Sequence, residues 1–128
     1  MKLIAGVMTG TSMDAIDVAV LQVEETTTLG QVRQDISLRG FFSRPIDVAL
    51  REALFELQQR GDDELHRSAL VANSFADAIS RTVLEGLAHL KLRSQDVIAI
   101  GVHGQTLRHQ PRLGYSIQLN APARIAET

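Results

Sequence analysis

The sequence predicts an α/β fold in which a mixed sheet is flanked by helices. Three observations support this prediction. Apolar, β-branched segments near the amino terminus are typical of strands, residues 64–90 have the spacing of an amphipathic helix, and residues 97–102 form a continuous apolar run. A chain of 128 residues is long enough to build its own core, so we expect a single domain over residues 1–128.

The amino-terminal third is expected to form three strands. Residues 1–8 are apolar except for Lys2, and residues 15–23 alternate between two faces of a second strand. These faces carry Ile16, Val18 and Val20 on one side and Asp17, Ala19 and Leu21 on the other. Residues 24–30 are polar and rich in threonine, which predicts a loop, and residues 31–42 are expected to form the third strand.

Two helices are expected next. The first is predicted to begin at Pro45, because proline suits a first helical turn, and to end at Gly61. Its apolar residues are Ile46, Leu50, Leu54 and Leu57. The second begins after the acidic residues 62–64 and ends near basic residues, as the helix dipole favours. Its apolar stripe consists of Leu65, Ala69, Ala72, Ala76, Ile79, Val83, Leu87 and Leu90.

The carboxyl-terminal part is expected to return to strands. The apolar run at residues 97–102 predicts a strand buried on both faces, and it leads into residues 103–106 at its carboxyl end. Ligands of open α/β sheets bind at that end of the strands. Residues 108–110 are predicted as a polar loop, residues 111–114 as a turn and residues 115–119 as a last strand.

Composition argues against several classes of function. The net charge is −2 and lysine and arginine do not cluster, so we expect no nucleic-acid partner. The absence of cysteine excludes disulfides and thiolate metal sites. The sequence has no run of about twenty apolar residues that would predict a membrane span, and residues 1–8 are too short for the apolar region of a signal peptide. We therefore expect no membrane partner and a cytoplasmic location.

The segment from Gly6 to Asp17 is the most informative of the chain, because a turn rich in glycine and hydroxyl groups joins two apolar strands. Such a turn can present backbone N–H groups to phosphate, with the hydroxyls of Thr9, Thr11 and Ser12 as further donors. An ordinary hairpin turn is the alternative. The candidate nucleotide-binding residues are Gly10, Thr11, Ser12, Met13, Asp14, Ala15, Ile16 and Asp17.

Two acidic residues of this segment are candidates for a magnesium site. A carboxylate beside a polyphosphate can bind Mg²⁺ through water, and Asp14 or Asp17 fits that role. The alternatives are a turn-forming role for Asp14 and a solvated strand position for Asp17.

A second group of polar residues follows the apolar run at residues 97–102. His103, Gln105, Thr106 and Arg108 could form hydrogen bonds to a polar substrate. Capping of the strand end by the loop itself is the alternative. Metal ligation by His103 and His109 would need a third ligand, which the sequence does not indicate.

Three segments resemble one known family in the same order and over the whole chain. Residues 10–17 (G-T-S-M-D-A-I-D) resemble the G-T-S-x-D-G-x-D signature of the anhydro-N-acetylmuramic acid kinases. Residues 103–109 resemble the family's H-G-Q-T-x-R-H segment, and residues 116–127 its Q-I-G-D-P-x-x-I-A-E segment. This chain departs from the family at Ala15, where glycine is usual, and at Asn120-Ala121, where Gly-Asp is usual.

The resemblance implies a fold and a reaction. The family has the actin-like ATPase (ribonuclease H-like) fold, so residues 1–128 would be the amino-terminal lobe of a longer, two-lobed kinase of cell-wall recycling. Such enzymes use ATP with Mg²⁺ to phosphorylate 1,6-anhydro-N-acetylmuramic acid at O6 while water opens the anhydro ring. Residues 10–17 would bind ATP and residues 103–108 the sugar. The family's catalytic aspartate has no matching position before Thr128, so we expect no catalytic base in this chain.

Two other interpretations stay open at this point. The chain could be a phosphate-loop or interaction module without activity, because half of a two-lobed kinase lacks the catalytic base. It could also belong to an actin-like phosphotransferase that acts on another sugar. The expected partner is a small anhydro amino sugar, and a homodimer is open as the form of the full-length protein.

Overall fold

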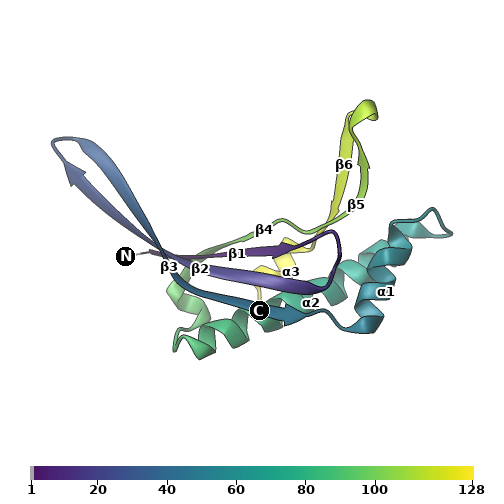
Figure 1. Cartoon of the computed structure of the whole chain (residues 1–128), viewed down its shortest axis with the longest axis horizontal. Coiled ribbons are helices and arrows are strands. Elements are labelled where there is room, and N and C mark those ends of the chain that lie inside the picture. Colours follow the sequence, from purple (N-terminus) through teal and green to yellow (C-terminus); the bar gives the residue numbers. More distant parts are fainter. Residues whose placement is uncertain (1) are drawn as a thin grey trace.

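A computed structural model describes residues 2–128 of the chain (Figure 1). Its strands are β1 (Lys2–Thr9), β2 (Ala15–Thr28), β3 (Gln31–Pro45), β4 (Val97–Val102), β5 (Gln105–Gln110) and β6 (Tyr115–Leu119). Its α-helices are α1 (Val48–Leu57), α2 (Glu64–His89) and α3 (Pro122–Ala126), and short 3₁₀ turns lie at Ser94–Asp96 and Pro111–Leu113.

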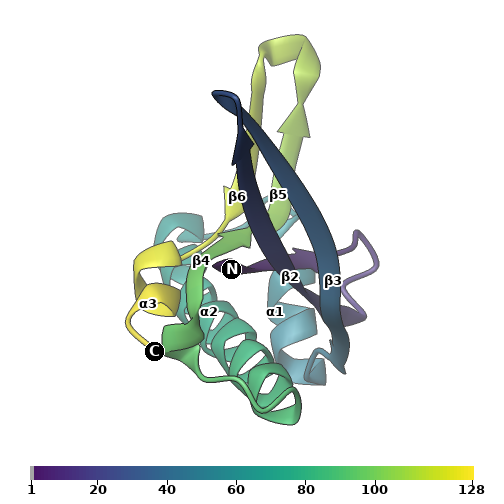
Figure 2. The same cartoon turned by 90° about the vertical axis from the view of Figure 1, so that its left-hand side faces the viewer.

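Four strands form one mixed sheet in the order β3-β2-β1-β4. β1 and β2 are antiparallel, β2 and β3 are antiparallel, and β4 is parallel to β1. Helices α1 and α2 lie on one side of this sheet (Figures 1 and 2). The arrangement confirms the predicted α/β class and agrees with one lobe of an actin-like, ribonuclease H-like fold.

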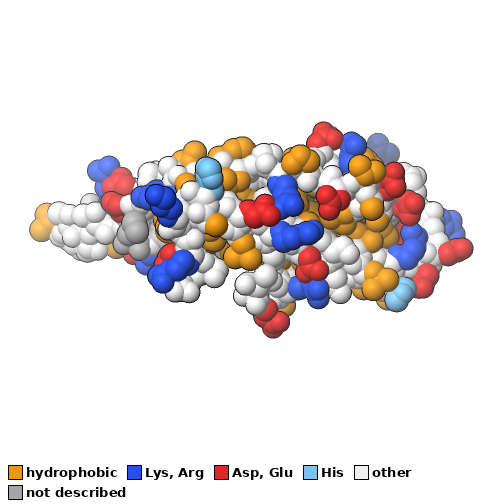
Figure 3. Space-filling model, turned by 90° about the horizontal axis from the view of Figure 1, so that it is seen from below, with side chains coloured by type: hydrophobic (Ala, Val, Ile, Leu, Met, Phe, Trp, Pro, Cys, Tyr) orange, Lys and Arg blue, Asp and Glu red, His pale blue; other side chains and the backbone are white. Residues whose placement is uncertain are grey.

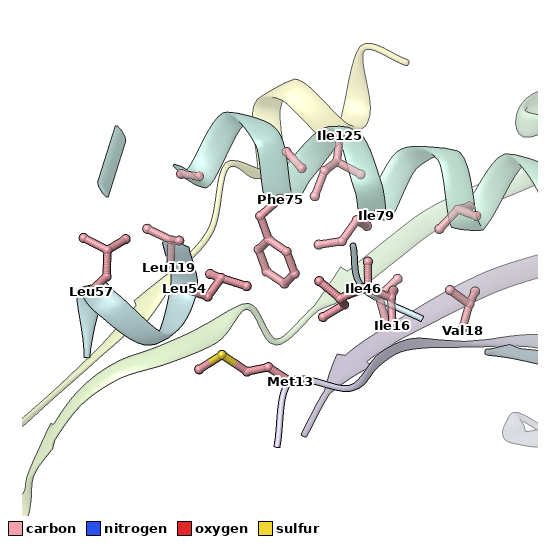
Figure 4. Close-up of a cluster of buried hydrophobic side chains, with 14 of the residues drawn as sticks. Met13, Ile16, Val18, Ile46, Leu54, Leu57, Phe75, Ile79, Leu119 and Ile125 are labelled. Carbon is pink, nitrogen blue, oxygen red and sulfur yellow. The ribbon is translucent and has the colours of Figure 1, made fainter. Parts of the chain in front are cut away.

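The core lies between the sheet and α2. The predicted alternation of β2 is confirmed, because Ile16, Val18 and Val20 are buried against the helices. Phe75 and Ile79 of α2 complete this layer, and Figure 4 shows the ring of Phe75 among the buried side chains. Burial of each such side chain stabilises the fold by roughly 1.5–3 kcal/mol.

Helix α2 has its predicted bounds, but its apolar stripe is buried over only part of its length. The stripe is buried from Ala72 to Leu87 and Leu90 is partly buried, whereas Leu65 is 86% exposed and Ala69 is also exposed. Within the described residues no element covers that side of the first two turns. Near its other end, Gly86 allows contact with β3, because a Cβ there would lie 2.5 Å from the ring of Phe42.

The β2–β3 hairpin is longer than the sequence predicted. Residues 24–28, expected to be a loop, continue β2 and pair with β3 as far as the Thr28–Gln31 pair. The β-branched threonines suit a strand as well as a loop, which explains the error. Leu29 and Gly30 form the turn with φ angles of 51° and 78°, a pattern typical of a two-residue type I′ hairpin.

The start predicted for the first helix is also wrong. Pro45 is the last residue of β3 and pairs with Ala15, and α1 begins only at Val48 after Asp47. Proline is tolerated there because β3 is an edge strand, so its missing N–H costs no ladder hydrogen bond.

Strand β4 is not buried on both faces, contrary to the prediction. It is an edge strand, paired only with β1, and Ile98 and Ile100 are 63% and 36% exposed. An apolar run indicates burial only where neighbouring elements exist, and no described element lies beyond β4. A groove of about 550 Å³ lies beside it, between β4, Leu87 of α2 and Ile125 of α3.

The polar loop predicted at residues 108–110 is instead the end of β5. This strand pairs with β6 in a separate hairpin that projects from the sheet (Figure 1). Residues 111–114 form the predicted turn, with Gly114 at φ 77°, and β6 has the predicted bounds.

Charged side chains of both signs are interspersed with hydrophobic ones on the face that carries the helices (Figure 3). Within residues 2–128, no helix is both long enough and apolar enough to cross a membrane.

Candidate functional site

The two segments singled out in the sequence meet at one edge of the sheet. β1 and β4 are parallel neighbours, so the turn after β1 and the loop after β4 emerge at the same edge. The hydroxyl of Thr9, the last residue of β1, lies 2.8 Å from Oε1 of Gln105 and 3.3 Å from the carbonyl oxygen of Gly104. The backbone N–H of His103 also donates to the carbonyl of Val7, at 3.3 Å. These contacts hold the two segments side by side, and they engage the Thr9 hydroxyl, predicted as a phosphate donor, within the protein.

Residues 10–14, hereafter the phosphate turn after the role that the sequence predicts for them, have backbone N–H groups that form no hydrogen bond within the described part of the chain. The N–H of Met13 donates to the carbonyl oxygen of Gly10 at 3.1 Å, which closes the turn. The N–H groups of Gly10, Thr11, Ser12 and Asp14 have no acceptor among residues 2–128, and these four residues are exposed. Several free N–H groups in one exposed turn can bind an anion.

Met13 anchors the phosphate turn in the core. Its side chain is fully buried, and its backbone φ angle is 52°, a value that residues other than glycine rarely adopt. Figure 4 shows Met13 below Phe75 and Leu54. Ala15, which stands where the family has glycine, is not among the described residues with positive φ, so its methyl group causes no backbone strain.

Arg51 of α1 is a residue of this site that the sequence did not indicate. Its guanidinium donates to the carbonyl oxygen of Ser12 from Nη2 at 3.1 Å and from Nε at 3.3 Å. The same Nη2 forms an ion pair with Oδ1 of Asp14 at 2.9 Å, and the guanidinium carbon lies 5.3 Å from the ring centroid of Phe55. Arg51 and Ser12 are 39 residues apart, so no local pattern could have joined them.

The two candidate magnesium ligands are in different surroundings. Asp14 faces Arg51, whereas Oδ1 of Asp17 accepts a hydrogen bond of 2.7 Å from the hydroxyl of Ser43 on β3. No group of three His, Cys, Asp or Glu residues gathers within the described part of the chain. Mg²⁺ beside a nucleotide needs only one or two carboxylates because phosphate and water supply its other ligands, so either aspartate fits such a site.

The predicted substrate-binding residues of the loop after β4 differ in exposure to solvent. His103 is exposed, and its Nδ1 lies 3.1 Å from the carbonyl oxygen of Gly104. Gln105 is only 2% exposed, and its Oε1 accepts a hydrogen bond from the hydroxyl of Thr9. Gly104 has φ 80°, and a Cβ there would lie 2.5 Å from the carbonyl oxygen of Leu119. A glycine is therefore required for the loop to lie against the end of β6.

Thr106 and Arg108 are held by neighbouring elements. The hydroxyl of Thr106 accepts a hydrogen bond of 3.0 Å from Nε2 of Gln118, and its carbonyl oxygen accepts one of 3.2 Å from Gln58. Arg108 forms a partly buried ion pair with Glu64 at the start of α2 and also donates to a carbonyl of α1. These contacts tie the β5–β6 hairpin to both helices.

Asn120 is a second residue that sequence reasoning did not assign. Its Nδ2 donates to the carbonyl oxygen of Val102 at 3.2 Å, so the side chain lies at the end of β4. Its Oδ1 is buried without a hydrogen-bond partner among the described residues. The departure of Asn120-Ala121 from the family's Gly-Asp pattern was the available signal.

The fold has the features of one lobe of an actin-like α/β fold, and the turn after β1 has N–H groups without an acceptor among residues 2–128. A family model described as Anhydro-N-acetylmuramic acid kinase matches residues 2–128, and the chain belongs to this family.

Three relatives show the extent of the similarity. The chain is 44% identical to the anhydro-N-acetylmuramic acid kinase of Bordetella pertussis (strain Tohama I) over 126 residues, which are 98% of this chain and 31% of that protein. The corresponding enzyme of Bordetella petrii is 42% identical, over 98% of this chain and 32% of its own length. That of Burkholderia pseudomallei (strain 1710b) is 43% identical, over 95% and 30% respectively. The chain thus spans about a third of these relatives.

Proposed function

We propose that residues 1–128 are the amino-terminal lobe of a two-lobed, ATP-dependent sugar kinase. The protein would hydrolyse the anhydro ring of 1,6-anhydro-N-acetylmuramic acid and phosphorylate O6, giving N-acetylmuramic acid 6-phosphate in cell-wall recycling. The observation that carries this proposal is the match to the family over residues 2–128. The free N–H groups of the phosphate turn, next to a loop with an exposed histidine, support it.

Different residues of the chain would bind the nucleotide and the sugar. Gly10, Thr11, Ser12 and Asp14 would donate backbone N–H groups to the phosphates of ATP, and the exposed hydroxyls of Thr11 and Ser12 would add further donors. When bound, ATP supplies the phosphoryl group and Mg²⁺ neutralises developing charge, with Asp14 or Asp17 as the carboxylate ligand. Met13, Ala15 and Ile16 would contribute to the nucleotide site through the backbone, because the side chains of Met13 and Ile16 are buried in the core.

On the sugar side, His103 is the side chain most open to a ligand, because it is exposed at the site edge. Gln105 would act through Thr9 and the loop backbone, since its side chain is buried. Thr106 and Arg108 would bind the sugar only by exchanging part of their present contacts with Gln118 and Glu64.

The test uses the full-length protein with ATP, Mg²⁺ and 1,6-anhydro-N-acetylmuramic acid. We expect one ADP for each sugar consumed, and a product heavier than the substrate by one water and one phosphoryl group. The 128-residue chain alone should release no ADP above the no-enzyme control, because the family's catalytic base has no counterpart in it. Turnover of other amino sugars but not of the anhydro sugar would instead assign the protein to another sugar.

A second candidate function applies to the 128-residue chain by itself, as an interaction module that associates with a second copy. The exposed apolar residues Ile98 and Ile100 of edge strand β4 favour it, since exposed apolar surface promotes association. Sedimentation of the chain would show a dimer if this function is correct. A monomer at every concentration would contradict it.

A further inference from the structure

Arg51 connects the phosphate turn to helix α1. It is the only basic residue in the described part of the chain whose side chain forms hydrogen bonds or ion pairs with residues 10–14. Its side chain is 42% exposed, so the guanidinium is open to solvent and to a ligand. Phe55, one helical turn further along α1, contacts the guanidinium face and limits its movement.

The contacts of Arg51 affect the turn in two ways. Two N–H groups of Arg51 hold the carbonyl oxygen of Ser12 toward α1, which fixes the position of this peptide group within the turn. The third contact neutralises Asp14, which lies among those N–H groups. A carboxylate at that place that does not bind Mg²⁺ would repel a phosphate, and its pairing with Arg51 reduces this repulsion.

Stability alone is a poor explanation for this arrangement. Ion pairs between exposed side chains contribute little to the free energy of unfolding. The chain has a comparable exposed pair between Arg124 of α3 and Asp77 of α2, with distances of 2.6 and 3.0 Å, and this pair has no contact with the phosphate turn. The difference between the two pairs is therefore their location.

We propose that Arg51 is a positioning residue for the phosphates of a nucleoside triphosphate. It fixes the Ser12 carbonyl and neutralises Asp14, so that the N–H groups of the phosphate turn face an anion. This role deepens the proposed function and rests on it. The ligand chemistry that it serves is polyphosphate, not the nucleoside.

The test measures binding of ATP and of adenosine to the full-length protein by titration calorimetry. Arg51→Gln is expected to raise the dissociation constant for ATP about tenfold, as loss of one charge-assisted interaction predicts, and to leave that for adenosine unchanged. Arg124→Gln is the matched control and should change neither constant. Arg51→Lys restores the charge but not the two-point contact with Ser12, so it should recover part of the loss.

A double variant tests the electrostatic part of the argument. In an Asp14→Asn background, Arg51→Gln should weaken ATP binding by a smaller factor, because no carboxylate remains to be neutralised. Equal ATP affinity of the wild type and Arg51→Gln would overturn the inference, as would an equal loss with Arg124→Gln. Failure of the wild-type protein to bind ATP would instead overturn the proposed function, so the two failures are distinguishable.

Discussion

The hydroxyl of Thr9 lies 2.8 Å from Oε1 of Gln105, and both side chains are buried. Thr9 ends β1 immediately before the phosphate turn, and Gln105 begins β5 immediately after the loop that follows β4. One buried hydrogen bond therefore connects the segment proposed for the nucleotide with the segment proposed for the sugar. Breaking a buried hydrogen bond of this kind is costly, because each polar group would then have neither a protein partner nor a water molecule to bond with.

The first prediction concerns this pair. Thr9→Val should lower the free energy of unfolding of the 128-residue chain by about 1–3 kcal/mol, because Gln105 loses its buried partner. Urea unfolding followed by circular dichroism measures the change. Thr26→Val, at an exposed position of β2, is the control and should have little effect. Equal stabilities of Thr9→Val and the wild type would show that Gln105 finds another partner.

The second prediction concerns Ser12, whose side chain forms no hydrogen bond within the described residues. A donor to a charged phosphate contributes roughly 1.5–3 kcal/mol, so Ser12→Ala in the full-length protein should reduce kcat/KM for ATP about ten- to a hundredfold. Thermal stability should not change. The control is Ser37→Ala on the β2–β3 hairpin. Unchanged kinetics would indicate that residues 10–14 form an ordinary hairpin turn that does not bind phosphate.

The third prediction separates the residues of the sugar loop. His103 is exposed, so His103→Ala should raise KM for the sugar and leave KM for ATP nearly constant. Gln105→Ala removes a buried side chain and should in addition lower the melting temperature. Steady-state kinetics with each substrate varied in turn measures both effects. A rise in KM for ATP alone with His103→Ala would assign the loop to the nucleotide.

The fourth prediction is a pH effect at the junction of α2 and α3. The hydrogen bond from Arg124 lowers the pKa of Asp77 below its ordinary value of 3.8. The folded state therefore favours the ionised carboxylate, so this stabilisation is present above pH 3.8 and is lost as the pH falls through the lowered pKa. Carbon-13 NMR should give a titration midpoint for Asp77 below 3.8. In Arg124→Gln the midpoint should return toward that value, and identical midpoints would contradict the assignment.

Local pattern was sufficient for much of the fold. The alternation of β2 and the bounds of α2 were predictable because one buried face imposes a period on the sequence. Two features were not predictable: the exposure of Ile98 and the extension of β2 to Thr28. Each depends on which strand lies beside the segment and not on the segment itself.

The candidate site likewise has features that local sequence pattern predicts and features that depend on distant residues. The positions of the turn at residues 10–14 and of the loop at His103 were predictable, because both follow apolar strands and carry polar residues. Their binding roles stay predictions. The ion pair of Arg51 with Asp14 and the bond of Thr9 with Gln105 join residues that are far apart in the sequence. Burial of Gln105 could not be read from a polar segment, because its partner comes from another strand.

The most direct test of the account is a crystal structure of the full-length protein with a non-hydrolysable ATP analogue, Mg²⁺ and the anhydro sugar. The account predicts phosphate oxygens within hydrogen-bonding distance of the N–H groups of Gly10, Thr11 and Ser12, and the sugar beside His103. A nucleotide bound at His103, or phosphates that do not contact the phosphate turn, would contradict it.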